Sequence, residues 1–267
     1  SEWGNNPPKT YRAAYPIGLA AVAAFQSWDS FTGYAFSQDG RPRGRLEPFE
    51  WESDPLSVTG IALGALIYRR GDVSPAKESV VLTIPEEEIY ELRWGDNTNR
   101  QVWNLVGLNA ALEQHRVQVV PPGFKADAEN VVQTMNCVES AEYNHPGTEL
   151  RSDTGELWRD WETGVGTLNT PRTQAAYGRL GDQDRAWRTE DCGFEIQTPF
   201  AVVALTSLTD DPIRDSERIL LAAMARAQNT GMGFNMARNR IVNNGTAPVI
   251  AEPVTGTVEI RTTHPAL

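Results

Sequence analysis

Two long apolar segments in the first seventy residues have the spacing of helices. Residues 11–25 are almost continuously apolar and rich in alanine, which favours a helix packed on more than one side, with Pro16 in its first turn. Residues 55–70 carry apolar side chains three and four positions apart, as on the buried face of an amphipathic helix. Asp54 before this segment and Gly71 after it are typical helix caps. The pattern therefore predicts two helices.

The segment between these helices is rich in aromatic residues and predicts a β-strand. It reads SWDSFTGYAF over residues 27–36, and Glu2 stands at the start of the chain where another strand would end. A strand ending in a carboxylate, a helix, and a strand carrying Trp and Asp are the arrangement of a (β/α) barrel. Such barrels place their chemistry at the carboxyl ends of their strands.

The pattern changes near residue 74, where a Ser-Pro pair marks a predicted domain boundary. Strands are predicted at 78–84 and 116–120, a helix at 101–114, and a surface loop at 121–145. From residue 150 onward, short apolar stretches alternate with turns, which is the pattern of an antiparallel β-sandwich. Residues 219–225 would also suit a helix by propensity. The predicted sandwich strands are 157–161, 165–169, 175–180, 194–196, 201–208 and 258–261, and the turns that flank 219–228 allow a strand there as well.

Several of these segments resemble one family of enzymes. The residues SEW, YRA and YP, then FQSWD and YAFS, are similar in order to the last barrel units of retaining glycoside hydrolases of the two-glutamate clan. Segment 54–77 resembles the closing barrel helix, and segments 152–181 and 243–260 resemble the β-sandwich that follows it. The resemblance also implies that residues 219–228 form a strand rather than a helix. The resemblance implies an α/β plus all-β fold. Residues 1–74 would be the C-terminal units of a (β/α)8 TIM barrel, and 75–267 an antiparallel β-sandwich with a helical and loop insertion around 86–145.

The resemblance also implies roles for individual residues. Retaining hydrolysis uses one carboxylate to attack the anomeric carbon and a second, roughly 5–5.5 Å away, to protonate the leaving oxygen. Glu2 falls on the nucleophile position, and Trp28 on the aromatic residue that stacks against the sugar. The ordinary alternatives are a surface glutamate near a chain end and a core tryptophan. The further candidates for substrate binding are Trp3, Asn5, Asp29 and Tyr34.

The predicted barrel is incomplete within this sequence. A full barrel takes about 250 residues, and only its last two units precede the sandwich. The acid/base glutamate of the family lies on a strand that this chain does not contain. We therefore expect a partner chain or an upstream segment to complete the barrel, and no hydrolysis by this chain alone. The alternatives are a non-catalytic carbohydrate-binding module and a structural subunit of a barrel partner.

Composition narrows the set of partners. The formal net charge of −11 argues against nucleic acid, because phosphate binding needs a basic surface. The longest apolar run is too short to span a membrane, so no membrane partner is expected. Carbohydrate is the expected substrate, and a secreted or periplasmic location suits a polysaccharide substrate better than the cytoplasm.

No motif in the sequence predicts a metal or a cofactor. The acids Asp153, Glu156, Asp160 and Glu162 could suggest calcium, but they lack the spacing of a calcium loop and are better explained as a solvated strand face. The three histidines His115, His145 and His264 have no metal-ligand spacing. The two cysteines, Cys137 and Cys192, lie far apart, and we expect two free thiols.

Overall fold

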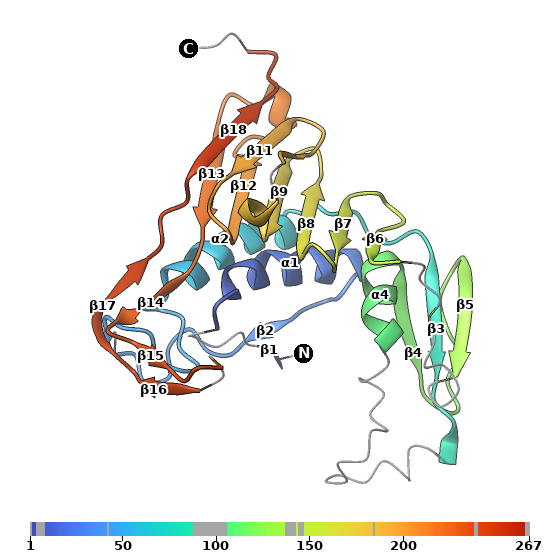
Figure 1. The fold of residues 1–267 in the computed structure, drawn as a ribbon. Helices are drawn as coiled ribbons and strands as arrows, with labels where there is room; N and C mark the ends of the chain where they lie inside the picture. Colours follow the sequence, from blue (N-terminus) through green and yellow to red (C-terminus); the bar gives the residue numbers. More distant parts are fainter. Residues whose placement is uncertain are drawn as a thin grey trace.

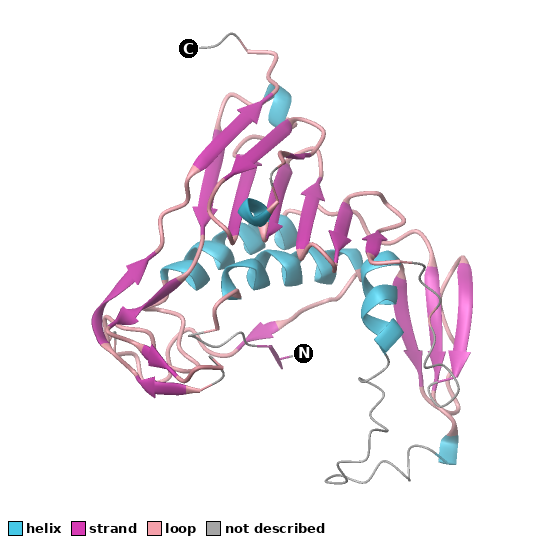
Figure 2. Cartoon of the chain, in the orientation of Figure 1, coloured by secondary structure: helices cyan, strands magenta, loops and turns pink. Residues whose placement is uncertain are grey.

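The fold is mixed, with few helices and many antiparallel strands arranged in several sheets (Figure 2). The computed structural model describes residues 2–3, 9–41, 43–87, 106–136, 143, 147–183, 185–237 and 240–264, with the backbone alone at 2–3 and 106–109. The centre of the molecule has three layers: two helices, a six-stranded sheet and a three-stranded sheet (Figure 1). None of the helices in the described ranges combines the length and hydrophobicity that a membrane crossing requires.

The two predicted helices are present. Helix α1 (Tyr15–Phe25) follows a short 3-10 turn, η1 (Arg12–Ala14), and has Pro16 in its first turn. Helix α2 (Pro55–Arg69) begins where the Asp54 carboxylate accepts a hydrogen bond from the backbone N–H of Leu56. The helices touch through two glycines of α2, and a Cβ at Gly60 would lie 2.7 Å from Pro16 Cγ. Small residues at this contact therefore permit the close approach of the two helices.

The strand predicted between the helices is much shorter than its aromatic content suggested. Strand β2 (Thr32–Gly33) pairs in parallel with β1 (Glu2–Trp3), in the register Glu2 with Thr32 and Trp3 with Gly33. Trp28 lies between α1 and β2, directly after Ser27. Ser27 has a φ of 55°, in the left-handed region, so the chain changes direction where α1 ends. No complete barrel is formed by the residues that the structure describes.

The predicted antiparallel sheets are confirmed. The six-stranded sheet has the order β13-β12-β9-β8-β7-β6, and the three-stranded sheet the order β10-β11-β18. In the six-stranded sheet the strands are β6 (Glu149–Arg151), β7 (Leu157–Asp160), β8 (Val165–Asn169), β9 (Thr173–Gly178), β12 (Ala201–Ser207) and β13 (Ile219–Met224). In the three-stranded sheet they are β10 (Trp187–Arg188), β11 (Cys192–Ile196) and β18 (Gly256–Ile260).

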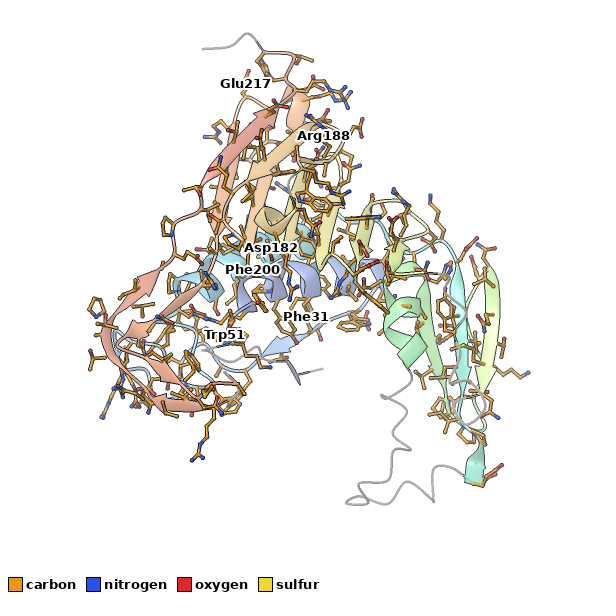
Figure 3. The ribbon with its side chains drawn as sticks, in the orientation of Figure 1. Phe31, Trp51, Asp182, Arg188, Phe200 and Glu217 are labelled. Atoms are coloured by element: carbon orange, nitrogen blue, oxygen red, sulfur yellow. The ribbon has the colours of Figure 1, made fainter. Side chains whose placement is uncertain are left out.

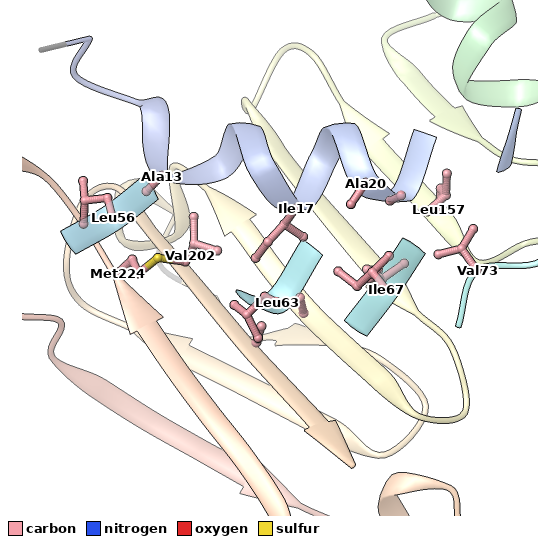
Figure 4. Close-up of a cluster of buried hydrophobic side chains, with 14 of the residues drawn as sticks. Ala13, Ile17, Ala20, Leu56, Leu63, Ile67, Val73, Leu157, Val202 and Met224 are labelled. Carbon is pink, nitrogen blue, oxygen red and sulfur yellow. The ribbon is translucent and has the colours of Figure 1, made fainter. Parts of the chain in front are cut away.

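The central strand β12 is buried on both faces. Alternate side chains point to opposite sides of a strand, so Val202 and Ala204 pack with the helices while Val203 and Leu205 pack with the three-stranded sheet. The core beneath the helices joins residues of the first seventy positions to sandwich strands (Figure 4). One buried cluster therefore has members on both sides of the predicted boundary at residue 74.

A small parallel sheet lies beside the sandwich, and it corrects one prediction. Strand β3 (Ser79–Thr83) pairs in parallel with β4 (Arg116–Val120) and β5 (Val131–Asn136), and helix α4 (Val106–Gln114) precedes β4. The segment 121–145 was predicted as a surface loop, yet it contains β5. Val80 and Leu82 of β3 are fully buried against Ala110 of α4 and Met135 of β5, and this local core explains the extra sheet.

Two short hairpin-like pairs complete the fold beside the loop that follows β2 (Figure 1). The predicted strand 219–228 is broken into β13 and β14 (Ala227–Thr230), which pairs with β17 (Thr246–Ala251). Strand β15 (Gly233–Phe234) pairs with β16 (Ile241–Asn243). The buried side chain of Asn229 holds this region to Leu46, accepting from its N–H at 2.6 Å and donating to its carbonyl at 3.0 Å. Two 3-10 turns are η3 (Leu180–Asp182) and η4 (Ile213–Asp215).

The described cysteine is a free thiol. Cys192 on β11 is buried, and burial raises its pKa to about 12, so the thiol is protonated at neutral pH. Cys137 lies outside the described residues. The prediction of a free thiol is therefore confirmed for Cys192.

Candidate functional site

The carboxyl ends of β1 and β2 lie at one edge of a parallel strand pair. The register aligns Trp3 with Gly33, so the chain leaves both strands at the same edge. Tyr34 is the first residue after β2. The side chains of Glu2 and Trp3 lie outside the described residues, and so does Asn5. The backbone thus brings the strand of Glu2 beside the residue that precedes Tyr34.

Three aromatic side chains are exposed on the loop that follows β2. Tyr34 is 45%, Phe36 61% and Phe49 47% exposed, which is unusual for rings of this size. The Tyr34 and Phe49 rings meet edge-on, with centroids 6.1 Å apart. We call Tyr34, Phe36 and Phe49 the aromatic patch. An exposed apolar patch of this kind is a candidate surface for contact with another molecule.

The backbone of the loop fixes where this patch stands. Ala35 N–H donates to the Phe49 carbonyl at 3.0 Å, and Glu52 N–H donates to the Phe36 carbonyl at 3.0 Å. These bonds fold the segment 34–52 back on itself, so its two ends run side by side. Phe49 has a φ of 62°, in the left-handed region that costs a residue with a side chain about 1 kcal/mol or more. The hydrogen bonds of the loop stabilise this backbone conformation, in which the Phe49 ring is exposed.

Trp51 forms the buried base of this loop. It is 6% exposed, and a Cβ built on Gly33 would lie 2.0 Å from its Cη2 atom. The indole ring therefore rests directly on the backbone of β2, which requires glycine at position 33. Figure 3 shows Trp51 and Phe31 below the helices, on the side of β1 and β2.

A buried ion pair ties the two strand-end segments together. Arg12 Nε lies 2.7 Å from Asp54 Oδ2, and Arg12 Nη2 lies 2.8 Å from Oδ1, a two-point contact between side chains that are 1% and 0% exposed. Ser57 Oγ also donates to Asp54 Oδ2 at 2.6 Å. Arg12 belongs to the segment after β1, and Asp54 closes the segment after β2. The pair therefore fixes the relative position of the two loops at the candidate site.

The loop that carries the aromatic patch also carries several carboxylates. Arg43 pairs with Asp39 at 3.0 Å, and Arg45 pairs with Glu47 at 2.6 Å. The Oε1 atom of Glu52 is buried and has no hydrogen-bond partner among the described residues. Aromatic faces stack on the apolar side of sugar rings, and carboxylates accept their hydroxyl groups. The loop therefore presents both kinds of group that contact sugars, although Asp39 and Glu47 are each paired with an arginine.

Trp28 and Asp29 lie at the opposite end of β2. They precede the strand and line a shallow hollow of about 390 Å³ with Arg116 and Gln118 of β4. The neighbouring Gln26 is buried and donates to the Leu112 carbonyl at 2.8 Å while accepting from Val117 N–H at 2.8 Å. This stretch attaches the small parallel sheet to α1. The structure therefore does not bring Trp28 together with Tyr34.

The exposed residues Phe36 and Phe49 were not predicted as site residues. Phe36 belongs to the aromatic run 27–36 and lies two residues after Tyr34, so the sequence could have suggested it as a further substrate-binding candidate. Phe49 stands in a charged stretch, and only the folding of the loop brings it to Tyr34. A contact that depends on loop folding leaves no local pattern in the sequence.

One group of side chains has the composition of a metal site. Single atoms of Glu78, His115 and Asp153 lie within 4.8 Å of one another. The Asp153 carboxylate already accepts from the N–H groups of Lys77 and Glu78, at 3.1 and 2.9 Å. His115 Nδ1 lies 3.3 Å from Glu78 and 3.4 Å from Asp153. Hydrogen bonding at the start of β3 accounts for this group.

Three of the four acids considered for calcium, Asp153, Glu156 and Asp160, are held by separate partners. Asp153 caps the start of β3, and Glu156 accepts from the N–H and hydroxyl of Ser74. Asp160 accepts from the Thr163 hydroxyl at 2.8 Å and from Glu162 N–H at 3.0 Å. Asp153 and Asp160 are themselves part of the packed structure rather than of a solvated face, because both side chains are largely buried and hydrogen-bonded.

Comparison with family models, with curated proteins and with solved structures finds no match to this chain. The function must therefore be argued from the geometry.

Proposed function

We propose that the chain is the C-terminal part of a retaining glycoside hydrolase that cleaves bonds in a poly- or oligosaccharide. The observation that supports this most directly is the parallel pair β1–β2 with the aromatic patch at its carboxyl end. The order β1, α1, β2, α2 agrees with two consecutive units of a (β/α) barrel. Sugar binding at the carboxyl ends of such strands would use Tyr34 and its neighbours.

In this proposal Glu2 is the nucleophile. Its carboxylate would attack the anomeric carbon, and the bond to the leaving oxygen would break as a second carboxylic acid protonates that oxygen. Water would then hydrolyse the glycosyl-enzyme ester. The acid/base comes from outside this chain. Trp3 and Asn5 remain candidates for substrate binding, whereas Trp28 and Asp29 fit this role less well than Tyr34 because they precede β2.

The partner that completes the barrel would pack along α1. Residues on the face of α1 and η1 turned away from α2 line a groove of about 600 Å³. Pro16 and Ala20 contact α2 from the opposite face. Helices of consecutive βα units stack in the order of their strands, so the next helix would belong to a strand paired with β1. The groove residues of this segment include Tyr11, Ala14, Tyr15, Gly18, Leu19 and Val22.

One charged pair lines the far wall of this groove. Glu113 of α4 pairs with Arg159 at 2.8 Å, and burial raises the pKa of Glu113 while the Arg159 charge opposes part of that rise. Glu162 and Arg179 also line the groove, and the rest of its lining is largely apolar or aromatic. An apolar helix face from an upstream segment or a partner chain would fill such a groove.

A mechanism-based fluorosugar tests the role of Glu2 in the assembled barrel. We expect the label on Glu2, and we expect Glu2→Gln to lose turnover by several orders of magnitude while still binding substrate. Glu217→Gln is the matched control, since Glu217 is exposed at the far end of the sandwich (Figure 3). Saccharide binding without any label would instead indicate a binding module, and label on another carboxylate would refute the assignment of Glu2.

A further inference from the structure

A hollow opens where the three-stranded sheet stops short of the six-stranded sheet. Arg151, Trp158 and Thr167 stand in one cross-strand row on β6, β7 and β8. Trp187 and Arg188 of β10 border this row, and the space between them is about 310 Å³. The unequal widths of the two sheets therefore leave the inner face uncovered at its β6 edge. Figure 3 shows Arg188 on the sandwich, well away from Trp51.

Three arginines border this hollow in a protein with a net charge of −11. Within the described residues, Arg151 and Arg185 have no carboxylate within 4.0 Å. Arg188 pairs with Glu259 at 3.2 Å, but both side chains are about two-thirds exposed, so a ligand can compete for the guanidinium. Glu149 of β6 lies outside this row, opposite Asp160, and accepts from Trp158 Nε1 at 3.4 Å.

Aromatic rings hold one of these arginines in place. The guanidinium carbon of Arg185 lies 3.9 Å from the centroid of the Trp187 ring. The Trp187 and Trp158 rings pack with centroids 5.9 Å apart. Stacking restricts the guanidinium plane while leaving its N–H groups available at the edge. The hollow therefore combines a preordered cation with an apolar wall.

We infer that this hollow binds a sugar unit with an anionic substituent, either a sulfate ester or a carboxylate. Arginine forms two-point hydrogen bonds to planar or tetrahedral oxyanions, which favours such groups over neutral hydroxyls. Thr167 and Asn169 line the same space and offer polar atoms to ring hydroxyls. The inference rests on the proposed function only for the choice of a saccharide as the ligand. It adds a second saccharide-binding site, which lies on the sandwich and remote from β1 and β2.

Calorimetry on the 267-residue chain tests this inference without turnover. The Glu2→Gln form is titrated with a sulfated galactose oligosaccharide, a galacturonate oligosaccharide of equal length, the neutral galactose oligosaccharide and sodium sulfate. We expect one or both acidic saccharides to bind about tenfold or more tightly than the neutral one, with affinity falling as salt rises. Quenching of tryptophan fluorescence by the bound sugar should accompany the heat, because Trp158 and Trp187 border the hollow.

Two variants locate the binding. Arg151→Ala combined with Arg185→Ala should weaken the acidic saccharide by about tenfold or more, whereas Arg218→Ala should leave it unchanged. Arg218 is an exposed arginine elsewhere on the sandwich, and its side chain has no ion pair among the described residues. Arg151→Ala alone serves if the double variant does not fold, since the Arg151 side chain has no ion pair with any carboxylate that the structure describes.

The inference fails on any of three results. These are equal affinity for acidic and neutral saccharides, binding unaffected by the arginine variants, and sodium sulfate binding as tightly as the acidic sugars. The third result would leave a simple anion site. The calorimetry uses the Glu2→Gln form and measures no turnover, so a failed fluorosugar label would refute the proposed catalysis without deciding whether the arginine-lined hollow binds acidic saccharides.

Discussion

Replacement of Arg12 by Met tests whether the buried ion pair holds the two strand-end loops together. Asp54 is 0% exposed and receives two hydrogen bonds from Arg12, at 2.7 and 2.8 Å. After Arg12→Met the carboxylate would keep only the Ser57 hydroxyl and the Leu56 N–H. An uncompensated buried charge costs about 3–5 kcal/mol of unfolding free energy. That loss is a large part of the stability of an ordinary domain.

A second variant separates the ion pair from the helix cap. Asp54→Ser keeps an oxygen that can cap α2, but it leaves the buried Arg12 with the Lys9 carbonyl as its other partner, at 3.1 Å. The double variant Arg12→Met with Asp54→Ser removes both charges together. It should therefore be more stable than the sum of the two single changes predicts.

Equilibrium unfolding in urea, followed by tryptophan fluorescence, measures these differences. Arg188→Ala is the exposed control, because its partner Glu259 lies at 3.2 Å with both side chains about two-thirds exposed. We expect that control to cost under about 1 kcal/mol. The reasoning is refuted if Arg12→Met costs no more than Arg188→Ala, or if the two changes simply add.

Two further predictions concern helix packing and pH. Gly60→Ala should destabilise the protein by about 1–3 kcal/mol, because the added Cβ would lie 2.7 Å from Pro16 Cγ. Gly18→Ala should stabilise it by up to about 1 kcal/mol, because no atom lies within 4 Å of the added Cβ and alanine favours a helix. Thermal unfolding midpoints that move in the same direction for both variants would contradict this reasoning. The hydrogen bond from the Thr163 hydroxyl lowers the pKa of Asp160 below its ordinary value of 3.8. The ionised carboxylate therefore stabilises the fold above pH 3.8, and this stabilisation is lost as the pH falls through the lower pKa of the folded state. Thr163→Ala should make the unfolding free energy less dependent on acid pH, and an unchanged pH profile would exclude this cause.

Local patterns in the sequence were sufficient for the helices and for most sandwich strands. Pro16, the Asp54 cap and Gly71, with its φ of 72°, act within a few residues of the helix ends that they define. The alternation of apolar stretches and turns likewise placed β7, β8 and β12 close to their observed bounds. These features depend on backbone preferences and neighbouring side chains, which a single sequence displays directly.

Part of the candidate site could also be predicted from the sequence. The aromatic run 27–36 contains Tyr34 and Phe36, and the resemblance named Tyr34 as a substrate-binding candidate. The resemblance also favoured Trp28, because an aromatic run does not reveal which of its residues precede the strand and which follow it. The position of the two-residue strand β2 depends on its pairing with β1, thirty positions earlier in the chain.

Only the tertiary structure decided which elements lie together. The strand at 79–83 was predicted, but its parallel pairing with β5 brings together residues some fifty positions apart. The shared core beneath α1 and α2 and the arginine-lined hollow at the sheet edge likewise join distant segments. Hydrophobic burial is non-directional, so an apolar strand in a sequence indicates that its side chains are buried but not which element covers them. The choice of partner is set by the packing of the whole chain.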